Sequence, residues 1–302
     1  MVSLNERVQI PFLGGHGWTD LIAELPCPAL LDVADSAARF RPTRGIIPKA
    51  DGRGDDVEKP IRKERVRRRS KPRDREGNRR GVCRPGANVA AVSRSSDDLE
   101  ALAASLPTEC VPIECDVRDD ETVERAVTTA VNCFGAIDVA VNSAGTIARG
   151  RLHEADETDL TMVLDVNLLG ALRVSKHVLP ALMETEGTLL HVTSEAGSVG
   201  VPELPSYCAS KGGLDAAVRQ LAVNYGPDGV SVVAIAPGTT KTSMNEEVRA
   251  EDPSWVKDRA ENVPYGRLGT PEDVSDLAAF LAQDRSDYLT GEVIHVDGGS
   301  TA

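Results

Sequence analysis

The chain has 302 residues and a formal net charge of −13 at pH 7, and this charge is divided unevenly along it. Residues 1–85 contain 19 Lys and Arg against 12 Asp and Glu, whereas residues 86–302 contain 15 against 35. The acidic part disfavours nucleic acids and anionic membranes as partners, because both carry negative charge. An acidic surface is also compatible with a high-salt cytoplasm, where ions screen the repulsion between like charges.

Composition limits the class of protein further. Hydrophobic residues make up 41% of the chain, enough for one large α/β domain with an extension. None of the six cysteines forms a CxxC pair, and no histidine lies at metal-ligand spacing from them. We therefore expect reduced thiols in a cytoplasmic protein without a bound metal. We find no apolar run of membrane-spanning length and no secretory signal.

Residues 1–85 give little indication of regular structure. One helix is possible over Thr19–Phe40. In residues 62–80, 11 of the 19 side chains are Lys or Arg, and such a stretch cannot form a buried strand because each buried charge is strongly destabilising. We therefore predict a basic, poorly ordered segment up to residue 85. A nucleic-acid-binding arm is the alternative, although no aromatic residues are interleaved with the basic ones.

From residue 88 onward, short apolar runs alternate with segments of helical periodicity. The apolar runs predict strands over residues 88–92, 111–115, 137–141, 188–193, 230–235 and 293–296. The helical segments lie at residues 97–106, 120–134, 157–183, 206–225 and 271–282. This alternation indicates βαβ units and hence a doubly wound parallel sheet of the Rossmann type. Ligands then bind at the edge where the strands have their carboxyl ends.

The segment Ser206–Lys211 carries the clearest chemical signal. Tyr207 and Lys211 are four residues apart, so on a helix they share one face. An isolated phenol has a pKa near ~10, and a nearby ammonium favours the phenolate and lowers that pKa. A tyrosine with a lowered pKa can give a proton to a carbonyl oxygen or take one from an alcohol.

Two further polar residues belong to the same prediction. Ser194 directly follows a predicted apolar strand, which places its hydroxyl at the ligand edge of the sheet, where it could polarise a carbonyl oxygen. Asn167 lies inside a long predicted helix, and the alternative for it is a structural amide that bonds to the backbone.

Several motifs in order resemble the pattern of the classical short-chain dehydrogenase/reductases. The resemblance covers about residues 86–302, and it rests on the following segments: Val141-Asn-Ser-Ala-Gly145, Asn167, Thr193-Ser194, Tyr207-xxx-Lys211, Pro237-Gly238 with Thr242, and Val296-Asp-Gly-Gly299. Ser143 stands where the family pattern has a second Asn, a mild departure.

The resemblance implies a role for each of these positions. Tyr207 would be the proton donor or acceptor, and Lys211 would lower its pKa and hold the nicotinamide ribose. Ser194 would orient the substrate carbonyl, and Asn167 would hold a water between Lys211 and solvent. The remaining positions would contact the cofactor: Asp116 and Val117 at the adenine, Asn142, Ala144 and Gly145 beneath it, and Pro237, Gly238, Thr240 and Thr242 at the nicotinamide amide.

Cofactor choice depends on the residues after the strand at 88–92. An Asp there would bind the ribose 2′-hydroxyl and select NAD(H). Ser93 and Arg94 stand there instead, and a guanidinium suits a 2′-phosphate. We therefore favour NADP(H), while NAD(H) remains possible and Arg94 could simply be solvated.

The family's opening strand and TGxxxGIG-type turn, whose glycines let a pyrophosphate approach a helix N-terminus, are missing. Gly14-Gly15-His16-Gly17 is not taken as this turn, because no strand is predicted around it. Codons exist for Lys71–Cys83 that, shifted by one base, encode Ser-Arg-Gly-Ile-Gly-Arg-Glu-Ile-Gly-Ala-Ala-Phe-Ala, which is the family's turn and first helix. We therefore predict a frameshift that replaced the first strand and turn.

These observations favour a reductase of small ketones or 3-oxoacyl thioesters, or the reverse alcohol oxidation. Residues 266–271 and the terminal VDGG resemble 3-oxoacyl-(acyl-carrier-protein) reductases and glucose dehydrogenases, so a sugar or polyol dehydrogenase is an alternative. Residues 243–264 would form the substrate lid, and the resemblance implies a homo-oligomer, a tetramer or a dimer. A second alternative is a protein of this fold that no longer binds cofactor, because its nucleotide turn is lost.

Overall fold

The computed structural model describes residues 8–12, 87–106, 108–252 and 254–302. The chain divides into two units, of which one combines Met1–Cys27 with Arg84–Ala302. The other unit, Pro28–Cys83, lies outside the described residues, and so do the Arg-rich run, the predicted helix over Thr19–Phe40 and the proposed frameshift.

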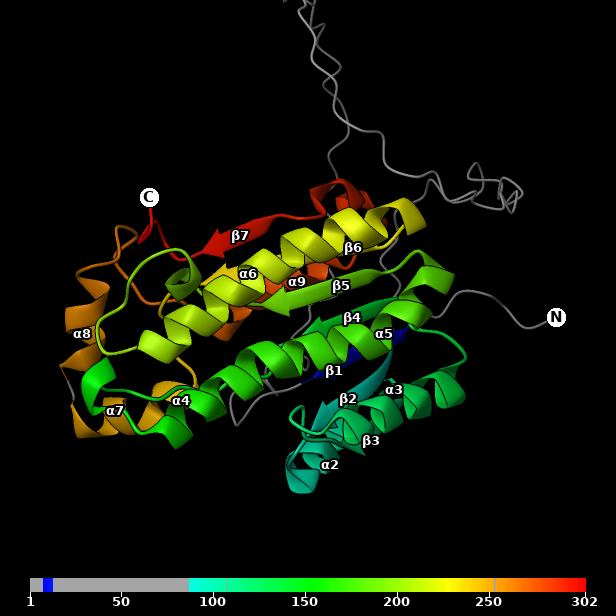
Figure 1. The fold of residues 1–302 in the computed structure, drawn as a ribbon, viewed down its shortest axis with the longest axis horizontal. Coiled ribbons are helices and arrows are strands. Elements are labelled where there is room, and N and C mark those ends of the chain that lie inside the picture. Colours follow the sequence, from blue (N-terminus) through cyan, green and yellow to red (C-terminus); the bar gives the residue numbers. More distant parts are fainter. Residues whose placement is uncertain (1–7, 13–86, 107, 253) are drawn as a thin grey trace, which may run out of the picture. The chain divides into compact units, whose positions relative to one another are not determined.

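A seven-stranded parallel sheet forms the centre of the described unit (Figure 1). Its strand order is β3-β2-β1-β4-β5-β6-β7, so the chain starts in the middle and winds outward in both directions. The strands are β1 (Val8–Phe12), β2 (Asn88–Ser93), β3 (Cys110–Glu114), β4 (Val139–Asn142), β5 (Thr188–Val192), β6 (Ser231–Pro237) and β7 (Val293–Val296). This confirms the predicted doubly wound α/β fold.

The helices are α2 (Ser96–Ser105), α3 (Asp120–Phe134), α4 (Glu157–Leu164), α5 (Ala171–Thr185), α6 (Pro205–Tyr225), α7 (Glu246–Glu251), α8 (Trp255–Ala260) and α9 (Pro271–Leu281). Most helices begin and end close to the predicted positions, whereas α7 and α8 lie in the segment 243–264, for which no helix was predicted. Capping residues set several of these ends. Asp119 accepts hydrogen bonds from two backbone amides of the first turn of α3, and Gly135 ends that helix in a left-handed conformation.

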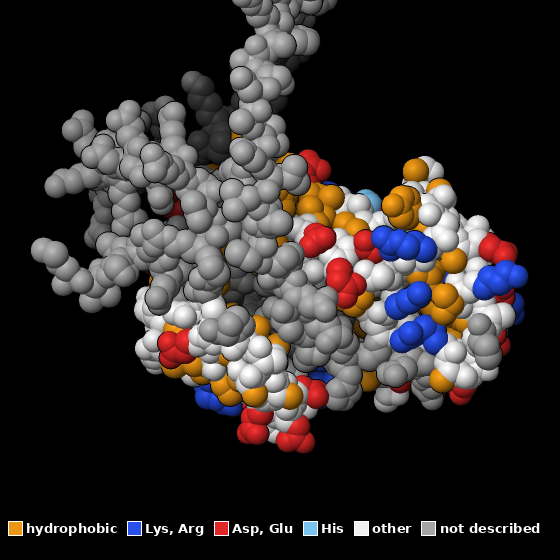
Figure 2. Space-filling view, turned by 180° about the vertical axis from the view of Figure 1, so that it is seen from behind, with side chains coloured by type: hydrophobic (Ala, Val, Ile, Leu, Met, Phe, Trp, Pro, Cys, Tyr) orange, Lys and Arg blue, Asp and Glu red, His pale blue; other side chains and the backbone are white. Residues whose placement is uncertain are grey.

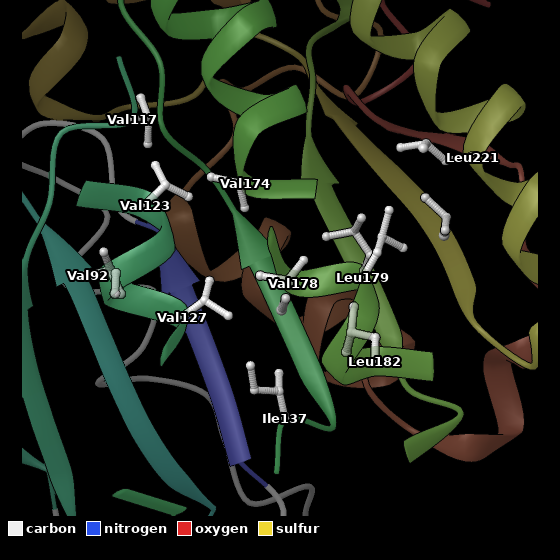
Figure 3. Packing of buried hydrophobic residues seen from close by; sticks show 14 of the residues in the cluster. Val92, Val117, Val123, Val127, Ile137, Val174, Val178, Leu179, Leu182 and Leu221 are labelled. Carbon is white, nitrogen blue, oxygen red and sulfur yellow. The ribbon is translucent and has the colours of Figure 1, made fainter. Parts of the chain in front are cut away.

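Successive residues of each strand face opposite sides of the sheet, and this alternation divides the core in two. Leu189 of β5 packs with the side chains of α3, α5 and α6, whereas Leu190 packs with those of α9. Figure 3 shows the first of these layers, in which Val123 and Val127 of α3 lie beside Val178 and Leu182 of α5. Both faces of the sheet are therefore covered, and its carboxyl edge is left to bind ligands.

The first strand corrects one expectation. We expected the sheet to lack its first strand, but Val8–Phe12 occupies that position, parallel to both β2 and β4. No strand is predicted there because Gln9 and Pro11 interrupt the apolar run, and proline is unusual in a central strand. The premise for rejecting Gly14–Gly17 as a turn, that no strand precedes it, was therefore wrong. These glycines themselves lie outside the described residues.

The long helix predicted over residues 157–183 is divided by a wider turn. Between α4 and α5 the chain makes a π-helical turn over Asp165–Gly170, a feature often found at functional sites. Gly170 lies against the loop that follows β3, where a Cβ atom would come within 2.7 Å of Cγ2 of Val117. The turn carries Asn167 toward the carboxyl edge of the sheet.

The described surface adds three observations. Figure 2 shows several Lys and Arg side chains at one side of the rear face, with Asp and Glu side chains among and around them, so the described part of this face is not uniformly acidic. Among the described helices, none combines the length and the apolar character needed to cross a bilayer. The described cysteines are free thiols, namely Cys110, Cys115, Cys133 and Cys208.

Candidate active site

The catalytic residues predicted from the sequence meet at the carboxyl edge of β5. This strand ends at Val192, and Ser194 follows as the N-cap of a 3₁₀ turn, Glu195–Gly197. Helix α6 then starts with Pro205, a residue whose fixed φ suits the first turn of a helix. Tyr207 therefore lies in the first turn of α6, and Lys211 lies one turn further along on the same face.

Lys211 is buried, and its ammonium group is held by the backbone. Its Nζ donates to the Val192 carbonyl oxygen at 2.9 Å and lies 5.8 Å from the centroid of the Tyr207 ring. Burial lowers the pKa of Lys211 to about 8, while the charge of Asp215 acts in the opposite direction. The side chain is therefore a cation at neutral pH, although burial makes it less basic than a solvated lysine.

The pKa of Tyr207 differs from the expectation. The sequence analysis expected Lys211 to lower it, but the pKa is raised above its usual value because burial disfavours the phenolate. A hydrogen bond with Ser194 opposes this effect without reversing it. The physical reason is that the Lys211 ammonium points to the Val192 carbonyl, while the Tyr207 side chain is half-buried and keeps only part of its contact with water. Tyr207 therefore carries its proton at neutral pH.

Ser194 lies between the two catalytic segments. Its hydroxyl oxygen accepts a hydrogen bond from the Ala196 amide at 3.2 Å, which closes the 3₁₀ turn. The same hydroxyl faces the Tyr207 phenol and acts to lower its pKa. A carbonyl oxygen placed between these two hydroxyl groups could accept hydrogen bonds from both.

Asn167 serves as a brace in this structure. Its Oδ1 accepts from the Thr146 amide at 2.8 Å, and its Nδ2 donates to the Thr146 carbonyl at 2.9 Å and to the Ser210 hydroxyl at 3.1 Å. The structural alternative weighed for this residue therefore describes its side chain. Its role in holding a water remains a prediction. Gly145 lies beside both groups, since a Cβ there would be 3.6 Å from Asn167 Oδ1 and 3.8 Å from Lys211 Nζ.

A pocket lies at the carboxyl ends of β2, β3 and β4. It brings together five of the predicted cofactor contacts, and its lining consists of Arg94, Cys115, Asp116, Val117, Arg118, Ala144, Gly145, Thr146, Met162 and Val166. Arg118 was missed by the sequence analysis. Its guanidinium binds the Asp116 carboxylate, with the shortest N···O distance 2.6 Å, and this pairing lowers the pKa of Asp116. A pair of charges two residues apart in a loop leaves no periodic signal that could have identified it.

Asn142 turns into the sheet. Its Nδ2 lies 3.3 Å from Nδ1 of His191 on β5, and Nε2 of that ring lies 3.1 Å from the Ser175 hydroxyl. Because Ser175 donates its proton to the Ala171 carbonyl, Nε2 of His191 must carry the ring proton. Burial lowers the pKa of His191 to about 3, so the ring is neutral. Asn142 Oδ1 is buried without a hydrogen-bond partner among the described residues.

The segment after β6 lies against the C-terminal turn. The Gly238 amide donates to the Val296 carbonyl at 3.0 Å, and a Cβ at Gly238 would come within 2.8 Å of Asp297 Cα. The Thr240 hydroxyl donates to the Gly238 carbonyl at 3.0 Å, and Thr242 is buried. Pro237, Gly238, Thr240 and Thr242 thus form a compact wall next to the catalytic edge.

A groove approaches the catalytic edge from the other side. Residues 150–153 line it together with the segment that precedes Tyr207, namely Val201, Glu203, Leu204 and Pro205. The Gly150 amide donates to the Glu203 carbonyl at 2.9 Å and joins the two segments. The groove therefore ends at Pro205, the first residue of the helix that carries Tyr207.

Comparisons with known proteins agree with this geometry. The sequence profile of the family described as enoyl-(acyl carrier protein) reductase matches residues 80–301. A 2-(S)-hydroxypropyl-CoM dehydrogenase 3 of Xanthobacter autotrophicus is 35% identical over 228 residues, which cover 73% of this chain and 89% of that protein. The 3-oxoacyl-(acyl-carrier-protein) reductase FabG of Thermotoga maritima is 35% identical over 219 residues, covering 71% and 87%.

Among solved structures, a short-chain type dehydrogenase/reductase from Mycobacterium marinum superimposes with a TM-score of 0.67 at 28% identity, over 72% of this chain and 86% of that one. The chain belongs to the classical short-chain dehydrogenase/reductase family. It is accordingly an oxidoreductase of the nicotinamide-dependent kind that acts on CH–OH groups.

Proposed function

We propose that the chain interconverts a ketone and a secondary alcohol with NADP(H), with Tyr207 as the proton donor or acceptor. The meeting of the Tyr207 phenol, the Ser194 hydroxyl and the buried Lys211 ammonium at the carboxyl edge of β5 carries this proposal. The nicotinamide would supply a hydride to the carbonyl carbon or accept one from the alcohol.

The protonation state of Tyr207 favours reduction of a carbonyl group at neutral pH. Tyr207 is protonated because burial raises its pKa, so it can donate to a carbonyl oxygen that gains negative charge. Ser194 would hold that oxygen in place. The Lys211 ammonium would then stabilise the phenolate that remains.

The residues around the pocket fit the adenosine half of a nicotinamide dinucleotide. Val117, Ala144 and Gly145 supply apolar and backbone surface, and the nearby Asn142 has a buried oxygen without a hydrogen-bond partner in the described part of the chain. Arg94 adds a positive charge to the same pocket, whereas the charge of Arg118 is paired with Asp116. This charge supports NADP(H) over NAD(H), because guanidinium groups bind phosphate well.

Cofactor choice can be tested by changing one charge. Arg94→Ala should raise KM for NADPH at least about tenfold, the effect of losing a charge-assisted hydrogen bond, and leave KM for NADH nearly unchanged. Arg125→Ala removes the same charge from an exposed position on α3 and serves as the control. Equal effects on the two cofactors would contradict the assignment.

For the substrate we propose a small ketone or a 3-oxoacyl thioester. Two relatives support this range by their names, one a hydroxypropyl-CoM dehydrogenase and the other a 3-oxoacyl-carrier-protein reductase. The groove lined by Leu152, Val201 and Leu204 offers apolar surface for such a chain. Initial rates with NADPH and a panel of 3-oxoacyl thioesters, short ketones and oxidised sugars would separate this proposal from the sugar dehydrogenase alternative.

The competing possibility is a family member that no longer binds cofactor. It is favoured by the Arg-rich sequence at the position where the family's glycine turn belongs. NADPH binding and turnover should be measured for the full chain and for a frame-restored version that carries the family turn. Activity only after restoration would support a damaged turn. Equal activity would show that the chain binds its cofactor as it stands.

We also propose a homo-oligomer, a tetramer or a dimer. Three leucines on the π turn and its flanking helices remain exposed to water, namely Leu164, Leu169 and Leu172, with 37%, 46% and 37% of their surfaces accessible. A group of exposed large apolar side chains is typical of a protein–protein contact. Sedimentation equilibrium of the wild type and of a Leu169→Glu variant would test this, and a wild-type monomer would contradict it.

A further inference from the structure

Asp215 is a buried carboxylate without a role in the proposed reaction. It lies one turn after Lys211 on α6, and only 2% of its surface is exposed. Neither of its carboxylate oxygens has a hydrogen-bond partner among the described residues. Burial raises the pKa of Asp215 above its usual value, and the Thr193 hydroxyl, which donates to the Ile235 carbonyl at 3.3 Å, opposes this rise without reversing it. A buried acidic side chain left without donors is destabilising, so its presence at this position calls for an explanation.

The carboxylate lies where the two catalytic segments touch. Gly197, in the turn that Ser194 caps, has no room for a side chain, because a Cβ there would overlap Asp215 Oδ2 and approach the Lys211 carbonyl carbon within 3.1 Å. On the helix side, a Cβ at Gly212 would lie 3.2 Å from the Gly197 carbonyl oxygen. The Ser194 turn and the Tyr207 helix are therefore packed together at Asp215.

The charged groups around this contact are few. Asp215 is faced by Lys211, by Arg219 on the next turn of α6 and by His295 on β7. Lys211 itself is faced by Asp215, by the Tyr207 ring and by His191, which is neutral. Asp215 is thus the negative charge that acts on Lys211, and it does so through the protein interior, since Nζ points to the Val192 carbonyl.

We propose that Asp215 is a positioning residue whose carboxylate keeps the Lys211 ammonium charged beneath the Tyr207 phenol. Burial favours the neutral amine, and the buried carboxylate one helical turn away opposes that tendency. The catalytic meaning of this charge rests on the proposed function of Lys211. The electrostatic effect itself does not depend on turnover.

A direct titration of Lys211 tests the effect in the full chain. The chain is labelled with 15N-lysine, the Nζ signal is assigned by its loss in Lys211→Met, and its pH midpoint is compared between the wild type and Asp215→Asn. We expect the midpoint to fall by about one pH unit, a tenfold loss of proton affinity. Asp228→Asn, which removes the same charge from an exposed position just after α6, should leave it unchanged.

The pH dependence of carbonyl reduction gives the second measurement. The alkaline limb of kcat/KM should move to lower pH in Asp215→Asn by the same amount, with little change at pH 6.5, whereas a merely structural role would lower the rate at every pH. An unchanged Lys211 midpoint overturns the proposal, whatever the activity. A shifted midpoint with an unshifted rate profile supports Asp215 and contradicts the role proposed for Lys211.

A second variant keeps the test possible if Asp215→Asn does not fold. Asp215→Leu has a similar volume and also removes the charge, so it replaces Asp215→Asn in the titration if that variant does not fold. If neither variant folds while Asp228→Asn does, Asp215 is a structural residue and the proposal is overturned.

Discussion

The strands β5 and β1 occupy comparable places in the sheet, each with a parallel neighbour on both sides, but their residues suit those places very differently. In β5 all five residues of TLLHV are buried, as expected for a strand covered on both faces. β1 has the sequence VQIPF, with a polar side chain and a proline in a central position. The sequence of β5 is thus typical of a buried parallel strand, whereas the sequence of β1 is unusual for its central position in the sheet.

The largest expected effect is the loss of stability that follows removal of β1. Deletion of residues 1–12 leaves β2 and β4 without a partner between them and removes several backbone hydrogen bonds at ~1 kcal/mol each, so we expect a loss on the order of 5 kcal/mol. Urea unfolding followed by circular dichroism measures it, and deletion of residues 1–5 is the control. An unchanged midpoint would mean that another segment forms the central strand.

Removing the Tyr207 hydroxyl tests the candidate catalytic site at the carboxyl end of β5. Tyr207→Phe should lower kcat for carbonyl reduction by about 10²–10⁴-fold, the usual contribution of a positioned proton donor, with little change in the KM for NADPH. Tyr288→Phe, at a fully exposed tyrosine, should leave kcat unaffected. If turnover by Tyr207→Phe were comparable to that of the wild type, another group would have to supply the proton.

The same contrast explains what the sequence could predict. From residue 88 onward all the strands and most of the helices have a local pattern, an apolar run or a helical repeat, and their predicted bounds agree with the structure within a few residues; α7, α8 and the π turn were not predicted. Tyr207, Lys211 and Ser194 could be singled out because their spacing and their place after a strand are local features. The strand β1 could not be predicted, because it is fixed by pairing with β2 and β4, far away in the sequence.

Two features of the site also depend on tertiary packing. The raised pKa of Tyr207 results from burial and from the direction in which the Lys211 ammonium points, and neither is visible in a four-residue spacing. The hydrogen bonds of His191 join β4, β5 and α5, so only the folded chain brings their partners together.

His191 on β5 gives the next prediction, which concerns the pH dependence of the free energy of unfolding. The folded chain keeps His191 neutral down to about pH 3, whereas an unfolded histidine takes up a proton below about pH 6.5. Unfolding therefore becomes easier as the pH falls through this window, by roughly 5 kcal/mol in total. His191→Asn should lose less stability than the wild type between pH 7 and pH 4.5, as measured by urea unfolding.

An exposed histidine provides the control for that experiment. His153 has 72% of its side chain accessible, so His153→Asn should keep the pH dependence of the wild type. The same slope in His191→Asn and in the wild type would contradict the buried, neutral ring.

The smallest expected effect tests whether β1 lies where the structure places it. Pro11 pairs with Val141 of β4 but has no N–H to donate to a neighbouring strand. Pro11→Val supplies that donor and a side chain suited to strands, so we expect the free energy of unfolding to rise by about 1 kcal/mol. Pro112→Val in β3, an edge strand with one neighbour, should gain less. Because proline restricts the unfolded chain, its replacement outside a sheet would destabilise slightly, so a loss of stability in Pro11→Val would contradict the central position of β1.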